Sequence, residues 1–404
     1  MFKSKTYKKP FFTRMLNKNL AYALAAFLMA AAAAAPAFSY EFEDRIGMPT
    51  DALYGSIFTR NMSMVSIDKA VIDLVQVKGK REVSAIGDPG TGNQDNFKYT
   101  IKEKDEAIGF LLPLGGASFG ADTHLTTKDL DVSVLRRGQI VSETFRERTW
   151  RAHFLVDLTQ HTHAGFSYRF LKVENDIYGD FFLSNEDKTD YLGELSGYMA
   201  NFYSRETDFG WGGYYAPAMR GKSEIEGEQK ILTSPGTAGL NFIYYAQKKW
   251  TLGVEATRWF YKTDDRDDLS TSPIDQRTIS LSGLDLEQRL WNTQRMSIGF
   301  DYLVKKDFKI RANFYRQTAA WVFRADRVPF DDPEAETVMT YDGWKLALNY
   351  NQKQFYLQAG IMQSERALST FQDTRQDGSW FGHRIFGDYK AKDNYTFLGL
   401  GFEQ

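Results

Sequence analysis

The sequence predicts an all-β protein, a transmembrane antiparallel up-and-down β-barrel of about fourteen strands with a short N-terminal plug. Three observations predict this fold. An export signal begins the chain, apolar residues alternate with polar ones, and short turns alternate with long polar connections. A barrel wall requires such alternation, because one face of each strand meets lipid and the other meets the lumen.

Residues 1–39 are typical of a cleaved secretory signal peptide. Six basic residues and no acidic residue precede an apolar, alanine-rich run at 20–35. Small residues then offer two cleavage positions, after Ala37 or after Ser39. The apolar run is short for a membrane-spanning helix of about 20 residues, so we expect cleavage and not a permanent anchor.

The composition that remains after cleavage favours a membrane barrel. The net charge falls from −2 to near −8, because 44 basic residues then face 52 acidic ones, and this balance argues against a nucleic-acid partner. The mean hydropathy is −0.45 although 15% of the residues are aromatic. A polar average with many aromatics fits a wall whose apolar outer residues alternate with polar inner ones. With no cysteine, the exported chain needs no disulfide.

Alternation is clearest in the hairpin 344–361, where apolar residues take every second position on both sides of the turn 351–354. Tryptophans lie at the ends of such apolar stripes, as an aromatic girdle at a membrane interface requires. They are Trp150, Trp211, Trp250, Trp291 and Trp344. This placement favours a membrane barrel over a soluble β-sandwich.

The same pattern predicts the strands in order. They are 62–78, 104–112, 117–126, 143–159, 165–174, 191–203, 208–219, 237–246, 250–261, 291–304, 308–322, 341–350, 355–366 and 381–402. Long polar connections lie at 175–190, 220–236, 262–290, 323–340 and 367–380. An even number of strands places both chain ends on the periplasmic side. We therefore expect residues 62–404 to form the barrel and residues 40–61 to enter the lumen as the plug.

The second half of the chain resembles the FadL family of outer-membrane channels for long-chain fatty acids and aromatic hydrocarbons. Residues 291–302 are similar to a strand of that family that begins with tryptophan and ends in Gly-x-x-Tyr, and 305–315 to the turn and strand that follow. Segments 212–227, 234–240 and 326–332 resemble further strands and loops of the family. The family's plug motif, Asn-Pro-Ala, is missing from the comparable region 51–64.

This resemblance implies passive uptake of hydrophobic small molecules, such as long-chain fatty acids, by a monomer in the bacterial outer membrane. The implied partners are an apolar ligand, membrane lipid and lipopolysaccharide, with no cofactor. The ligand would first bind among the extracellular loops and then enter an apolar pocket inside the barrel. A shift of the plug would release it, and one possible exit is sideways through a gap in the wall. Candidate ligand-binding residues in and beside the plug are Leu53, Tyr54, Ile57, Phe58, Arg60, Met62 and Met64. Arg60 suits a ligand carboxylate, whereas all seven could equally well pack the lumen.

Two other function classes stay open on the sequence alone. A general diffusion porin predicts a water-filled lumen and ion conductance. A barrel enzyme or adhesin predicts function in the long loops, or a Ser or Asp beside His153 or His163. No serine stands at a recognisable spacing from His153, which lies on the polar face of its strand. We therefore expect no catalytic residue and no metal site, and we interpret His161 and His163 as solvated turn residues.

Overall fold

The computed structural model describes residues 58–59, 61–65, 68–88, 95–135, 139–179, 187–225, 228–233, 236–245, 249–260, 290–322, 336–371, 384–385 and 387–404. The signal peptide expected at 1–39 and most of the plug expected at 40–61 lie outside these residues. Within the part that is described, no helix is both long enough and apolar enough to cross a bilayer.

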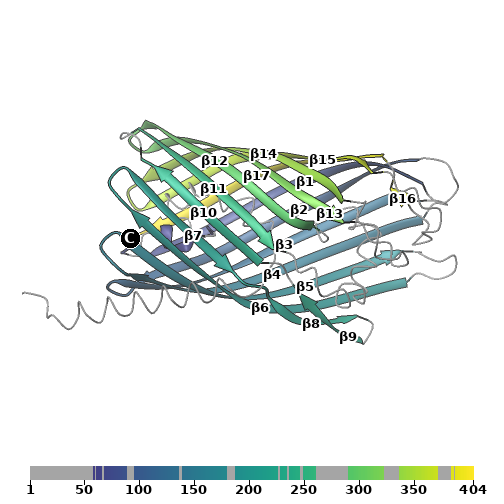
Figure 1. Cartoon of the computed structure of the whole chain (residues 1–404), viewed down its shortest axis with the longest axis horizontal. Helices are drawn as coiled ribbons and strands as arrows, with labels where there is room; N and C mark the ends of the chain where they lie inside the picture. Colours follow the sequence, from purple (N-terminus) through teal and green to yellow (C-terminus); the bar gives the residue numbers. More distant parts are fainter. Residues whose placement is uncertain are drawn as a thin grey trace, which may run out of the picture.

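The described residues form one sheet of 17 strands, and all but β8, β9 and β16 close into an antiparallel ring of fourteen (Figure 1). The ring consists of β1 (Val71–Asp88), β2 (Asp95–Pro113), β3 (Ala117–Leu135), β4 (Gln139–Asp157), β5 (Thr162–Gly179), β6 (Asp187–Arg205), β7 (Phe209–Ala216), β10 (Gly236–Tyr244), β11 (Trp250–Phe260), β12 (Leu290–Lys305), β13 (Phe308–Val322), β14 (Glu336–Gln352), β15 (Phe355–Phe371) and β17 (Gly387–Glu403). β1 pairs with β2 on one side and with β17 on the other, which closes the ring. The predicted fold class and strand number are thereby confirmed.

Several predicted strand boundaries were wrong. The strand expected at 62–78 begins only at Val71, because Met62–Met64 form the short 3-10 helix η2. The strand expected at 104–112 spans Asp95–Pro113. Inside the loop expected at 220–236 lie β8 (Arg220–Ile225) and β9 (Glu228–Thr233). The sequence pattern missed the outer parts of these strands because they carry charged residues. A strand that continues beyond the lipid meets water on its outer face, so it no longer needs apolar residues at every second position.

Towards the short-turn end, the strands of the wall have an apolar outer face, and polar side chains occupy many of their inner positions. On β14, Leu346 and Leu348 are exposed while Lys345 and Asn349 are buried. Trp150 on β4 also points outward, as its place in the predicted girdle requires. Exposed leucine beside buried lysine reverses the arrangement of a water-soluble protein and matches a wall surrounded by lipid.

The two ends of the barrel differ in their connections (Figure 1). One end carries tight turns, such as Gly115–Gly116 between β2 and β3, where both residues have a positive φ that glycine adopts without strain. At the same end Ala70 and Gln404 exchange two backbone hydrogen bonds of 2.9 Å. The start of the wall and its C-terminus therefore lie together at the short-turn end, as the even strand number predicted.

Candidate functional site

A short segment ahead of the wall lies inside the barrel near its short-turn end. This plug segment comprises residues 58–59 and 61–65, and all seven are buried. Asn61 Nδ2 donates a hydrogen bond of 3.0 Å to the carbonyl oxygen of Phe202 on β6. The backbone N–H of Ser63 donates to Asn201 Oδ1 at 3.0 Å, and the Ser63 hydroxyl donates to the same oxygen. Asn241 of β10 adds two hydrogen bonds, since its Oδ1 accepts from Asn61 Nδ2 at 3.4 Å and its Nδ2 donates to the Met64 sulfur at 3.0 Å. Hydrogen bonds to β6 and β10 thus anchor the plug segment.

The structure describes three of the seven predicted ligand-binding residues. Phe58 and Met62 are fully buried, and Met64 is nearly so. The Phe58 ring lies nearly perpendicular to the His124 ring of β3, with ring centroids 5.2 Å apart. Their burial fits both interpretations that the sequence allowed, a ligand contact and packing of the lumen. The other four lie outside the described residues, and they are Leu53, Tyr54, Ile57 and Arg60.

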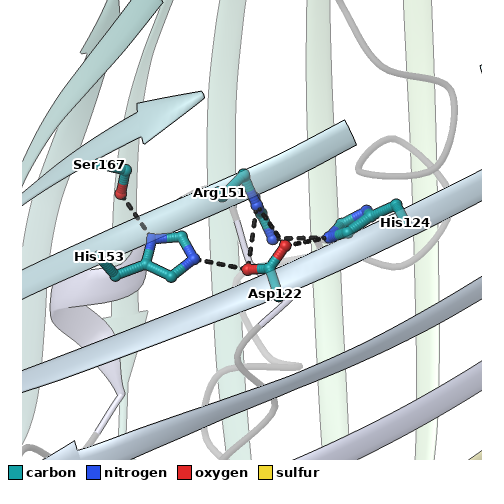
Figure 2. Close-up of polar contacts among 5 residues, drawn as sticks. All are labelled: Asp122, His124, Arg151, His153 and Ser167. Atoms are coloured by element: carbon teal, nitrogen blue, oxygen red, sulfur yellow. Dashed lines mark hydrogen bonds and ion pairs between the residues drawn. The ribbon is translucent and has the colours of Figure 1, made fainter. Parts of the chain in front are cut away.

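Five lumen-facing residues of β3, β4 and β5 form an ion cluster, which Figure 2 shows around the Asp122 carboxylate. Arg151 Nε donates to both oxygens of Asp122, at 2.9 and 3.1 Å. His124 Nε2 lies 2.7 Å from Oδ1 and His153 Nε2 lies 2.5 Å from Oδ2 of the same carboxylate. On the far side of its ring, His153 Nδ1 is 2.7 Å from Ser167 Oγ. Strand register explains the grouping, since Asp122 stands opposite Arg151 and His153 opposite Ser167.

This cluster is the feature that sequence reasoning missed. The enzyme interpretation required a Ser or an Asp beside His153, and the structure places Ser167 and Asp122 there. The only signal in the sequence was a polar residue at every second position of neighbouring strands, which does not reveal their register. Chemically, the Arg151 guanidinium already neutralises the Asp122 carboxylate, and Ser167 is fully buried in the wall. We therefore assign the cluster to joining β3, β4 and β5 as a buried ion pair with added hydrogen bonds.

Buried ion pairs also join other parts of the lumen wall. Arg81 Nε donates to Asp393 Oδ1 at 2.7 Å across the β1–β17 closure. Ser364 Oγ donates to the second oxygen of that carboxylate at 2.8 Å. On β12 and β13, Arg311 Nε donates to Asp301 Oδ1 at 2.8 Å. The prediction that polar strand faces line the lumen is thus confirmed.

One part of the wall lacks regular pairing. β6 pairs with β7 from Arg205–Gly210 to Ala200–Tyr215, and pairing resumes with β8 at Ser196–Arg220. Three residues of β6, 197–199, therefore face four residues of the neighbouring segment, 216–219. Pro217 explains part of this break, because proline has no N–H to donate to a ladder. We refer to residues 197–199 and 216–219 as the seam.

The inner side of the seam is apolar. Met219 of the seam forms one buried cluster with Leu171 and Leu195, and Met199 and Ala216 of the seam form another with Tyr214. Gly197 creates the space for Met219, since a Cβ atom at position 197 would lie 2.5 Å from Met219 Cγ. The inward-facing side chains of the seam itself are therefore apolar, whereas the neighbouring strand β5 places buried Arg169 opposite Gly197.

The turn histidines hold no metal centre in the described part of the chain. His161 is exposed, as predicted, whereas His163 Nδ1 lies 2.5 Å from Asp157 Oδ1 and is half-buried. Among the described residues, no group of three or more His, Cys, Asp or Glu side chains is arranged to hold a metal ion.

No family model and no curated protein matches the sequence. Solved structures do match the fold. A Pseudomonas aeruginosa FadL homologue aligns with a TM-score of 0.54 at 12% identity, over 88% of this chain and 94% of that one. The Pseudomonas putida toluene transporter TodX aligns with a TM-score of 0.57 at 9% identity, over 89% and 93%. The monoaromatic hydrocarbon channel CymD aligns with a TM-score of 0.50 at 8% identity, over 85% and 90%. At such identities the likeness concerns the fold, and the chain has the FadL-like barrel fold that its sequence resemblance implied.

Proposed function

We propose that the protein is a monomeric channel of the bacterial outer membrane through which hydrophobic small molecules, such as long-chain fatty acids, diffuse passively. The observation that carries this proposal is the seam, where apolar lumen residues meet an interrupted hydrogen-bond ladder. The names of similar barrels support the same class, since one is a FadL homologue and another a toluene transporter.

The exterior of the barrel supports its placement in a membrane. Its wall exposes leucine, phenylalanine and tryptophan, which lipid solvates better than water does. In the outer membrane the short-turn end faces the periplasm, and the expected signal peptide supplies the export route. A lipopolysaccharide leaflet resists apolar solutes, so an apolar route through a protein accelerates their entry.

In this proposal, movement of Met219 at the seam helps to connect the lumen with the surrounding lipid. Met219 fills the space beside Gly197, and methionine is unbranched and adapts readily to a changing neighbour. No ladder hydrogen bond between 197–199 and 216–219 has to break when Met219 moves. The plug segment is bonded to Asn201, two residues from Met199 of the seam, so a shift of the plug would reach the seam directly.

The first test combines two measurements on one refolded preparation. A fluorescent long-chain fatty acid is titrated onto the barrel, and single-channel conductance is recorded in a planar bilayer. Saturable binding with little conductance is the expected result. A steady, large conductance without binding would instead identify a general diffusion porin, the second function that the polar lumen residues allow.

The second test locks the seam. Met199 and Ala216 pack in one buried cluster, and the chain has no other thiol to compete, so a Met199→Cys/Ala216→Cys variant should form one disulfide across the seam. We expect release of the bound fatty acid to slow about tenfold in the oxidised variant, because the disulfide prevents the seam from opening, and to recover on reduction.

A matched control places the same bond in a regular ladder. Thr126 and Glu147 stand opposite each other on β3 and β4, so Thr126→Cys/Glu147→Cys should form a disulfide without slowing release. Equal release rates in the oxidised and reduced seam variant would exclude the seam as the exit route.

A further inference from the structure

The outer face of β17, β1 and β2 carries a concentration of positive charge. Six exposed lysines lie there, two on each strand, and together we name them the lysine patch. They are Lys78, Lys80, Lys102, Lys104, Lys390 and Lys392. Two glutamates lie on the same strands, Glu82 and Glu106, and two more carboxylates stand opposite patch lysines on the flanking strands, Glu365 on β15 and Asp129 on β3. Six positive charges against four negative ones leave an excess of two.

The strand register brings like charges together in this patch. Lys78 stands directly opposite Lys104, and Lys80 directly opposite Lys102. Directly opposed like charges destabilise a sheet. Glutamates of the same strands pair with Lys80 and with Lys104, but no ion pair within the described residues joins Lys78 or Lys102 to a carboxylate. An anion bound between these two strands would offset the repulsion.

The lysine patch begins where the lipid-facing band should end. Lys78 follows Ala70, at the short-turn end, by eight residues. At about 3.3 Å per residue and a strand tilt of about 40°, this distance is roughly 20 Å along the barrel axis. The apolar band of such barrels is about 25 Å tall. With the short turns in the periplasm, Lys78 and Lys104 therefore lie just inside the outer edge of the band, from which a long lysine side chain reaches the headgroups. The other four lysines lie at that edge or beyond it.

A different part of the wall shows that this charge excess is local. On the outer face of β13 and β14, Arg316 and Asp342 stand opposite each other. Arg316 donates two hydrogen bonds to that carboxylate, of 2.6 and 2.7 Å. That pair is neutral as a whole, whereas the lysine patch leaves cations in excess.

We propose that the lysine patch binds the phosphate groups of lipopolysaccharide in the outer leaflet. Clustered lysines beside a membrane attract anionic headgroups, and the ammonium group is a compact partner for phosphate. The proposal shares only the outer-membrane placement with the proposed function. Lipid A binding and fatty acid binding use opposite faces of the wall, so either can fail alone.

The test uses the refolded full-length barrel in detergent and measures binding of purified bisphosphorylated lipid A. Dephosphorylated lipid A is the comparison ligand, and Lys78→Gln/Lys102→Gln is the variant, because these two lysines have no ion pair to lose. We expect the variant to bind bisphosphorylated lipid A about 25-fold more weakly, roughly fivefold for each lysine removed. Fatty acid binding by the same variant should be unchanged, which also shows that it is folded.

A charge-matched control removes two exposed lysines at the opposite end, with Lys305→Gln/Lys306→Gln. This control should bind lipid A as the unmodified protein does. The proposal would be overturned if the unmodified protein bound dephosphorylated lipid A as tightly as the bisphosphorylated form. It would also be overturned if the control variant lost as much affinity for lipid A as Lys78→Gln/Lys102→Gln does. So would displacement of lipid A by excess inorganic phosphate alone, since the site would then recognise free phosphate.

Discussion

The β3–β4 wall and the seam hold neighbouring strands together in opposite ways. Between β3 and β4 the ladder runs without a break from Ala117–Val156 to Ser133–Ile140, and the Asp122–Arg151 ion pair lies on its inner face. Between β6 and the segment that continues from β7 into β8, the ladder stops for residues 197–199, and the inward-facing side chains there are apolar. One region is joined by directional bonds and the other by packing alone.

This difference indicates which part of the barrel wall can rearrange most easily. A buried charge must keep its partner, because an unpaired ion in the protein interior is costly, and strands joined in this way move together. Apolar side chains at a break lose only dispersion contacts when they rearrange, and an apolar ligand restores those contacts. In the proposed function, the wall would therefore remain closed at β3 and β4 while the seam opens.

The largest effect should follow from breaking the ion cluster. Asp122→Ala leaves the Arg151 guanidinium without its carboxylate, and we expect the free energy of unfolding to fall by about 3–5 kcal/mol. Denaturant titration in lipid vesicles, followed by tryptophan fluorescence, measures this loss. The control is Asp129→Ala, which removes an exposed carboxylate from the outer face of the same strand and should change stability little. Similar losses of unfolding free energy in both variants would show that the buried ion cluster does not hold β3 and β4 together more firmly than an exposed carboxylate does.

A smaller effect should come from filling the space at the seam. Gly197→Val places atoms where Met219 packs, and overpacking of this kind costs about 1–3 kcal/mol. Adding Met219→Ala should recover most of that stability, because it removes the atoms in conflict. The four unfolding free energies of a double-mutant cycle measure this coupling. Strictly additive effects would mean that Gly197 and Met219 do not meet.

The smallest effect on stability should come from loosening the plug segment. Asn201→Ala removes the oxygen that accepts two hydrogen bonds from Ser63, and we expect a loss of about 1–2 kcal/mol. Conductance should rise more clearly, since the plug segment is then less restrained. Asn349→Ala removes another buried lumen amide, on β14, and should leave conductance unchanged. Unaltered conductance in Asn201→Ala would show that this bond does not restrain the plug.

The candidate site was predicted only in part. Burial of Phe58, Met62 and Met64 follows from an apolar segment ahead of a barrel, and the structure places all three inside. The partners of His153 were not foreseeable, because Asp122 and Ser167 lie 31 and 14 residues away in the chain. Only the offset between neighbouring strands brings them together, and period-two alternation contains no information on that offset.

The sequence by itself determined that the chain forms a barrel, how many strands close it, and which face of each strand meets lipid. These properties are local, since alternation along one strand specifies its two faces without reference to any neighbour. The tertiary structure decided where the wall begins, at Val71, which residues join across the lumen face, and where the ladder breaks beside Met219. Register and its interruptions arise only when strands distant in sequence pair and the ring closes, so they depend on all the strands together.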